Sequence, residues 1–346
     1  MEIQRMNHTR NTAAILRDPG LLAILLVLHG IVFFPGIALC QRADAPTLAY
    51  KQVDQWPMPA TSAAGAPGPW NFGQVSAVAV TATGNVLVLH RGSHPILEFE
   101  SNGKFVRSWG EGMISEGKVF TIAPPYQAAG RTIHSAVYGP AGCTSCGAHS
   151  IRVDREGNIW VVDATGQIVY KMNQQGRVIM QLGTKGVSGA GRNTFNLPTD
   201  VAFGPDGDIY VSDGYANERV VKFSPEGKYL LEWGKRGSGP GEFTLPHNLA
   251  VDGMGRVYVT DRENRRIQVF DSDGKFLKEW ADVGGISALF MTKEQQLWAG
   301  GTLFDLDGKV LGKLPGGVGG HGVAVSPSGD VYVAQLSGVV QKFVKE

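Results

Sequence analysis

The sequence predicts an all-β protein folded as a six-bladed β-propeller, from its composition and from a segment that occurs six times. The chain has 346 residues, including 47 Gly and 18 Pro. Its valine-rich alternating segments are bounded by Gly, Asp, Asn and Pro, which is typical of strands joined by tight turns. One propeller can use this length as a single unit. Lys and Arg number 32 against 31 Asp and Glu, so the net charge of +1 offers no excess to attract nucleic acid, and we expect no such partner.

The repeated segment has the strand pattern of a propeller blade. Each copy has a strand of the Leu-Ala-Val-Asp type, a turn, a second strand of the Val-Tyr-Val type and a third that commonly ends in Lys-Phe; many copies add a fourth strand ending in Trp-Gly. The clearest copies span residues 198–234 and 246–281, and the others begin near Val75, Ala148, Ile286 and Gly320. Because one such sheet cannot bury both faces alone, the copies are expected to stack around an axis.

The repeats assign residues 73–346 to the propeller and residues 41–72 to a lead-in. The last copy ends at Phe343 after three strands. A strand at residues 48–53 could complete it and close the ring, which would remove two free sheet edges. Residues 111–147 form an insertion, either a lid over the channel or an inert surface loop.

Residues 1–40 have the pattern of an export signal. Arg5, Arg10 and Arg17 precede a charge-free run over residues 21–40, which is interrupted by Pro35. This order predicts a secretory signal, cleaved after Cys40, or an uncleaved anchor, since about 20 apolar residues can span a bilayer. We therefore expect a periplasmic or secreted protein that contacts a membrane only through that segment.

Two cysteines would remain after cleavage, Cys143 and Cys146. A disulfide or two free thiols is the favoured interpretation in an exported chain. They precede His149, but a Cys/Cys/His metal site would lack a fourth ligand at suitable spacing.

Histidine recurs at one position of the repeat. The copies align on turn residues Gly84, Gly157, Gly207, Gly255, Gln295 and Gly329. Eight residues before them lie Ser76, His149, Thr199, His247, Ser287 and His321. Alternate blades of a six-bladed ring are about 120° apart and their innermost strands line the axis, so the three imidazoles should converge. Three neutral imidazoles are a catalytic zinc set with one position open for water or substrate. The alternative is three ordinary polar residues at strand ends.

A second register lies fifteen residues after the histidine position. Arg91 and Arg262 occupy it in the first and fourth copies, and Tyr215 lies one residue beyond it in the third. Arginine suits planar carboxylate recognition, and tyrosine beside a cation can act as a general base. These residues could instead make structural contacts between blades.

Several stretches resemble a known enzyme family. Residues 195–201, 211–224, 245–250 and 261–270, which include Asp213-Gly214-Tyr215 and Asp261-Arg262-Glu263-Asn264, are similar to peptidyl-α-hydroxyglycine α-amidating lyases, which are NHL-repeat propellers. The resemblance implies zinc on His149, His247 and His321, a catalytic Tyr215, and functional arginines at Arg91 and Arg262. It also implies calcium on the backbone carbonyls of Val78 and Ile151. However, Gly322 stands where the calcium carboxylate is expected, which places calcium in doubt.

The resemblance implies a zinc-dependent carbon-nitrogen lyase. Such an enzyme would cleave the N–Cα bond of a peptidyl-α-hydroxyglycine-like carbinolamide and release an amide and glyoxylate. Its substrate would be a small molecule or peptide with a terminal carboxylate. One alternative is a non-catalytic propeller that binds a peptide, protein or glycan. Another is a calcium-dependent hydrolase of lactones or sugar derivatives, which would need inward carboxylates.

Overall fold

The computed structural model describes residues 45–58, 72–115, 120–121, 126–128, 131–133, 136–137 and 147–346. The predicted signal or anchor at 1–40 and the pair Cys143 and Cys146 lie outside these ranges. Regular structure in the described ranges is entirely β. A search of the same ranges for helices long and apolar enough to cross a membrane finds none.

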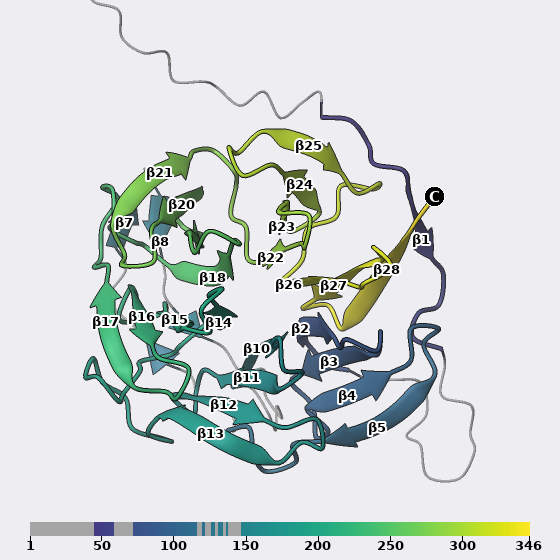
Figure 1. The fold of residues 1–346 in the computed structure, drawn as a ribbon, viewed down its shortest axis with the longest axis horizontal. Coiled ribbons are helices and arrows are strands. Elements are labelled where there is room, and N and C mark those ends of the chain that lie inside the picture. Colours follow the sequence, from purple (N-terminus) through teal and green to yellow (C-terminus); the bar gives the residue numbers. More distant parts are fainter. Residues whose placement is uncertain are drawn as a thin grey trace, which may run out of the picture. The chain divides into compact units, whose positions relative to one another are not determined.

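Six sheets surround a common axis, each made of four antiparallel strands (Figure 1). From the innermost strand outward, the first sheet has β2 (Val75–Val80), β3 (Val86–His90), β4 (Ile96–Phe99) and β5 (Phe105–Trp109), and the second has β10 (Ala148–Val153), β11 (Ile159–Asp163), β12 (Ile168–Met172) and β13 (Val178–Gly183). The third sheet has β14 (Asp200–Phe203), β15 (Ile209–Asp213), β16 (Arg219–Phe223) and β17 (Tyr229–Trp233), and the fourth has β18 (Pro246–Val251), β19 (Val257–Asp261), β20 (Arg266–Phe270) and β21 (Phe276–Trp280). The fifth sheet has β22 (Leu289–Met291), β23 (Leu297–Ala299), β24 (Thr302–Phe304) and β25 (Val310–Lys313), and the sixth has β26 (Gly322–Val325), β27 (Val331–Gln335), β28 (Val339–Lys345) and β1 (Tyr50–Val53). The prediction of a six-bladed β-propeller is confirmed.

Two short strand pairs lie within the predicted insertion at 111–147. They are β6 (Phe120–Thr121) with β9 (Ala136–Val137), and β7 (Tyr126–Ala128) with β8 (Arg131–Ile133).

The core lies between neighbouring sheets. Strands β3, β11, β15 and β19 are buried along their whole length, because a sheet covers each of their faces. This double coverage explains their nearly continuous apolar sequences. The outermost strands β17 and β21 alternate between more and less buried residues, as expected for strands with one solvated face. The second strands, on which the innermost strands pair, are therefore held by packing on both faces.

The lead-in supplies the fourth strand of the sixth sheet. Strand β1 pairs antiparallel with β28, so the last sheet contains both ends of the described propeller. Just beyond β1, the ring of Trp56 packs against Phe99 of the first sheet and Tyr332 of the sixth, with centroid distances of 5.8 and 5.1 Å. Its indole Nε1 donates a hydrogen bond to the Ser101 carbonyl at 3.1 Å. Trp56 thus joins the first and last sheets.

Replacing Trp56 with alanine is expected to lower the free energy of unfolding by about 3–5 kcal/mol, the usual cost of removing a large buried aromatic side chain. Trp56 is 7% exposed, so most of its ring would leave a cavity. Urea denaturation followed by circular dichroism measures the change. Met254→Ala is the control, because Met254 is 70% exposed. Equal stability of the two variants would contradict a role for Trp56 in ring closure.

Candidate metal centre

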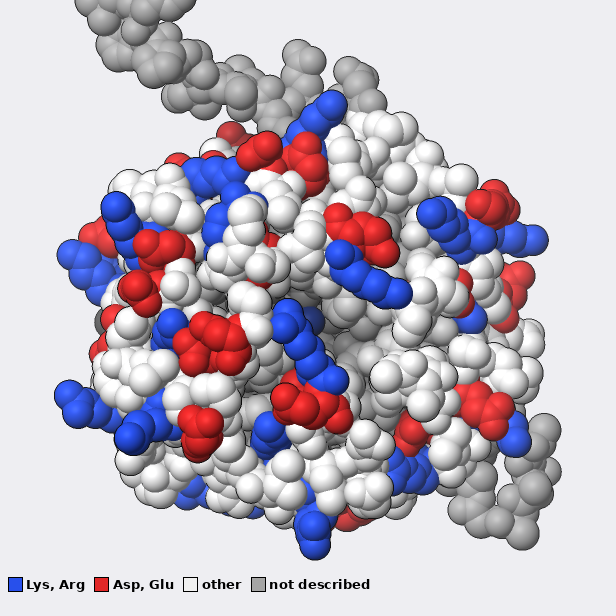
Figure 2. Space-filling model, in the orientation of Figure 1, with Lys and Arg blue, Asp and Glu red and all other residues white. Residues whose placement is uncertain are grey.

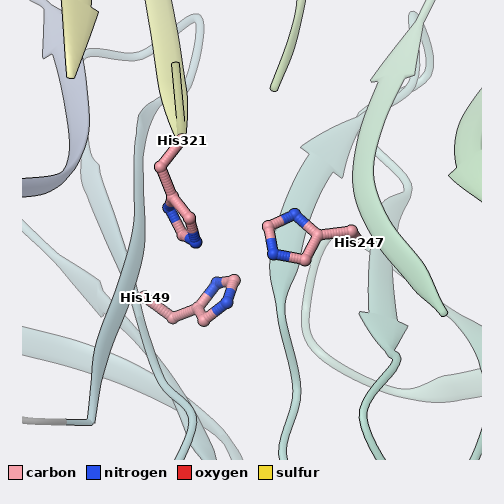
Figure 3. Close-up of side chains that lie close together, drawn as sticks. All are labelled: His149, His247 and His321. Carbon is pink, nitrogen blue, oxygen red and sulfur yellow. The ribbon is translucent and has the colours of Figure 1, made fainter. Parts of the chain in front are cut away.

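Three histidine side chains meet at the axis (Figure 3). His149 lies in β10, His247 in β18, and His321 directly before β26. One ligand nitrogen from each lies within 4.8 Å of the others, and the ring centroids are 4.9 to 5.0 Å apart. All three are buried, at 2%, 0% and 9% exposure for His149, His247 and His321. The trio could hold a metal ion.

Irregular strand pairing accompanies two of these histidines. The register of β10 on β11 shifts between Ala148 and Ser150, and that of β18 on β19 shifts between Pro246 and Leu249. A bulge turns a side chain out of the regular alternation, and bulges are frequent beside functional sites. These shifts place His149 and His247 at irregular points of the innermost strands, where their side chains turn toward the axis.

Each imidazole is oriented by the backbone of the next sheet. A carbonyl oxygen only accepts hydrogen bonds, so each Nδ1 must carry the proton and the neutral ring keeps its lone pair on Nε2. The contacts are His149 Nδ1 with Thr199 O at 2.6 Å, His247 Nδ1 with Ser287 O at 2.9 Å, and His321 Nδ1 with Ser76 O at 2.7 Å. These carbonyls belong to Ser76, Thr199 and Ser287, which occupy the histidine position in the other three copies. All three rings therefore have one tautomer, with Nε2 available to an ion.

The environment keeps these histidines neutral. Burial first, and then the neighbouring His321 and Arg91, hold the pKa of His149 well below its ordinary value. Burial and then Arg262 do the same to the pKa of His247. Burial, together with Arg91 and Arg262, lowers the pKa of His321 to about 3. A neutral imidazole is the form that binds a metal ion.

Tyr215 lies in front of the trio. It follows β15, and its hydroxyl is 3.1 Å from His149 Nε2 and 3.4 Å from His247 Nε2. Its single O–H can donate to one of these two nitrogens at a time, so it occupies a lone pair that a metal ion would take. Its position places a proton-transfer group beside the candidate metal ligands.

The two predicted arginines lie near the same centre. Arg91 follows β3; its Nε donates to the Ala148 carbonyl at 3.2 Å, and a terminal nitrogen donates to Gln74 Oε1 at 2.6 Å. Burial lowers the pKa of Arg91, and the nearby Tyr215 opposes this shift.

Arg262 follows β19 and pairs with Glu263 at 3.0 Å, with 24% of its side chain exposed. Its effect on the pKa of all three histidines places its charge close to them. The structure thus brings Tyr215, Arg91 and Arg262 to the histidine site.

Val78 and Ile151 lie further along β2 and β10. They line a hollow of about 10 Å³ together with Arg152, Asn248 and Gly322. Sequence reasoning did not single out Arg152, although its guanidinium lies among the innermost strands, where it pairs with Asp200 at 2.5 Å. The carbonyls of Ser76, Thr199 and Ser287, which orient the three histidines, were also not predicted, because a backbone carbonyl has no signal in the sequence.

The face shown in Figure 2 is hollowed near its centre. Positive and negative side chains are intermixed around the hollow, with no broad area of one sign. This mixture agrees with the balanced net charge of +1.

The fold and site define a six-bladed β-propeller with a three-histidine centre on its axis. A family model described as a 6-bladed beta-propeller matches residues 199–282. The solved structure titled "Streptogramin B lyase structure" has a TM-score of 0.54 and 12% identity, covering 80% of this chain and 95% of that one. At this identity the likeness shows the fold alone.

Relatives in sequence carry the names of amidating enzymes. The mouse protein named peptidyl-glycine alpha-amidating monooxygenase is 38% identical over 57% of this chain and 20% of its own length. A Caenorhabditis elegans protein, named probable peptidyl-alpha-hydroxyglycine alpha-amidating lyase, is 27% identical over 77% of this chain and 80% of its own. The mouse NHL repeat-containing protein 3 is 31% identical over 54% of this chain and 48% of its own length.

This chain is similar in sequence to proteins named peptidyl-alpha-hydroxyglycine alpha-amidating lyase, as the sequence motifs predict. The match spans about a fifth of the mouse monooxygenase and most of the worm protein, at 20% and 80% of their lengths. The names of these relatives are those of amidating enzymes and of an NHL repeat-containing protein.

Proposed function

We propose that this protein is a zinc-dependent lyase that cleaves the N–Cα bond of a peptidyl-α-hydroxyglycine or a similar carbinolamide, releasing an amide and glyoxylate. The observation that carries the proposal is the buried histidine trio with Tyr215 in front of it. The names of the sequence relatives support the same reaction class.

The residues fit zinc. Zinc takes imidazole nitrogens readily, and catalytic zinc sites commonly use three protein ligands and leave one position open. His149, His247 and His321 would hold the ion through Nε2, since their Nδ1 atoms are engaged by backbone carbonyls. When bound, zinc would supply Lewis-acid polarisation of the substrate's α-hydroxyl oxygen.

Tyr215 is proposed as the general base. Its hydroxyl oxygen, as the phenolate, would take the proton of the α-hydroxyl group. The C–O bond then becomes the C=O of glyoxylate, while the electron pair of the N–Cα bond goes to the amide nitrogen, which takes up a proton. Arg91 lies near Tyr215, and its positive charge would stabilise the phenolate form.

Arg91 and Arg262 would together bind the terminal carboxylate and the charge that develops on the departing glyoxylate. A guanidinium can give a carboxylate two parallel hydrogen bonds. Arg262 is the more available of the two for substrate, because its guanidinium pairs with the adjacent Glu263 and is partly exposed. A substrate without this carboxylate should therefore bind more weakly.

The purified protein is expected to contain one equivalent of zinc and to release glyoxylate from α-hydroxyhippurate. A chelator should remove metal and activity together, and zinc should restore both. The methyl ester of the same substrate should show a KM raised ~10–100-fold, because charge-assisted hydrogen bonds to the carboxylate are lost. Metal analysis and a glyoxylate assay provide the measurements. Full activity in metal-free protein would contradict the proposal, and a metal-free, inactive protein would favour a binding propeller.

We also propose export to the periplasm or the outside of the cell, with any membrane attachment limited to an uncleaved N-terminal segment. The support is the charge-free run over residues 21–40 behind three arginines. Cell fractionation with N-terminal sequencing of the mature chain tests it, and full-length protein in the cytoplasm would contradict it.

A further inference from the structure

One position of the innermost strands carries an unexpected charge. Three residues after the histidine register, the six copies have mainly alanine, and the second copy alone has a charged residue. The series is Ala79, Arg152, Ala202, Ala250, Phe290 and Ala324. The Arg152 side chain is only 16% exposed. Burying a charged side chain among small apolar residues is costly unless it is paired and hydrogen-bonded, so Arg152 needs a specific explanation.

Arg152 is bonded across four consecutive sheets. From the second sheet it donates to both carboxylate oxygens of Asp200 in the third, at 3.0 and 2.5 Å. It also donates to Asn248 Oδ1 in the fourth sheet at 3.3 Å and to the Leu289 carbonyl in the fifth at 3.0 Å. A planar guanidinium can satisfy several acceptors at once, which a single ammonium group cannot do as well.

These acceptors are neighbours of the residues that build the histidine site. Asp200 follows Thr199, whose carbonyl orients His149, and it accepts a hydrogen bond from Ser150, which follows His149. Asn248 follows His247 and accepts the backbone N–H of Leu289 at 2.9 Å. The network around Arg152 therefore holds the backbone that follows two metal ligands, His149 and His247, and the backbone that follows their supports, Thr199 and Ser287.

Arg152 also lines two spaces beside the innermost strands. It lines the small hollow that includes His321. It lines as well a larger cavity of about 470 Å³ bounded by Asp154, Phe290 and Ser326, which come later on their strands than the histidine register. Arg152 and Val78 line both spaces, so the two spaces adjoin at these residues.

The same region does not fit the calcium that the family resemblance implies. Calcium takes six to eight oxygen ligands, usually with carboxylates among them. The hollow with Val78 and Ile151 has no carboxylate residue among its lining, and its one charged group there is the cation of Arg152. At Gly322, an added Cβ would lie 2.8 Å from the Cα of Ala77, so a carboxylate side chain there requires the strands to move. The nearby Asp200 is already engaged by Arg152.

We propose that Arg152 is a positioning residue that takes the place of a calcium ion: its guanidinium ties four sheets together beneath the histidines and makes the metal centre independent of calcium. The inference rests on the three-histidine site of the proposed function. It concerns how this chain holds that site, and it does not depend on which substrate is cleaved.

Two measurements test the proposal. Calorimetric titration and thermal unfolding of the wild-type protein with calcium chloride or with a calcium chelator should show no saturable binding and no shift in Tm. The Arg152→Met variant should bind zinc ~10–100-fold more weakly, the usual loss when a group supporting a metal ligand is removed. The visible absorption bands of its cobalt-loaded form should also shift, and Arg152→Lys should restore them in part.

Arg155→Met is the matched control, because Arg155 lies in the turn after the same strand and is exposed. It should keep wild-type zinc affinity and cobalt bands. If Arg152→Met does not fold, the Asp200→Asn variant replaces it. This change removes the charge of the partner of Arg152, and we expect the same loss of zinc affinity and the same shift of the cobalt bands. One calcium bound with a raised Tm, or unchanged cobalt bands and zinc affinity in the variant, would overturn the proposal. None of these measurements uses enzyme turnover, so a result against the role of Arg152 is distinct from a result against the lyase assignment.

Discussion

A His247→Ala variant is expected to lose its zinc and to release glyoxylate at least ~10³-fold more slowly than the wild type. His247 is fully buried, and its ring centroid is 4.9 Å from those of both other histidines. Two imidazoles hold zinc much less firmly than three, and Lewis-acid stabilisation contributes several kcal/mol, or about three powers of ten in rate. Zinc analysis of the purified variant and a glyoxylate assay measure the two losses.

The control is His94→Ala. His94 is a surface residue with 47% of its side chain exposed and with Glu111 as its partner at 2.5 Å. It should keep full zinc content and activity. Unchanged glyoxylate release in the His247 variant would remove the metal-dependent mechanism, because no other described group of His, Cys, Asp and Glu gathers as a candidate metal site.

The Tyr215→Phe variant is expected to keep its zinc and its fold while kcat falls ~10²–10⁴-fold, the usual contribution of a general base. The change removes one hydroxyl oxygen, the atom that lies 3.1 Å from His149 Nε2 and 3.4 Å from His247 Nε2. The phenylalanine ring can still pack against these imidazoles. Steady-state kinetics together with metal analysis separate loss of proton transfer from loss of the ion.

Tyr229→Phe provides the comparison for this variant. Tyr229 lies in β17, the outermost strand of the sheet whose second strand precedes Tyr215, and its ring contacts Phe223 and Arg192. Its removal should leave kcat unchanged. A Tyr215→Phe enzyme with wild-type kcat would show that the phenol is not the base, whereas a fall in zinc content would assign it a role in holding the metal.

The position of the histidine trio could be predicted from the sequence because the repeat has a fixed period. Once the turn glycines align the copies, His149, His247 and His321 share one structural position, and a closed ring of six sheets brings alternate copies to the axis. The proximity of Tyr215 follows from the same register. This inference needed no side-chain detail, because the strand order places the histidine position of every copy on the innermost strand, beside the axis.

The support of the site could not be predicted in the same way. Arg152 alternates with apolar residues on its strand, as an exposed arginine would, and only the contacts of Asp200 and Asn248 show that it is buried in the network. The orienting groups of the histidines are backbone carbonyls, which leave no residue preference in one sequence. Asp200 and Asn248 directly follow the histidine position in their copies. These two polar residues were the sequence signal for the network around Arg152.

The hydrogen bonds from each imidazole to the main chain of the following sheet have a consequence for how such a centre can arise. A sheet that gives a ligand must be followed by one that gives an acceptor, as with His321 and Ser76 across the ring closure. Each ligand therefore needs two sheets, one that carries the histidine and one that carries the accepting carbonyl. A ring with an odd number of sheets would break the alternation at one junction, so this coordination geometry is tied to the parity of the propeller.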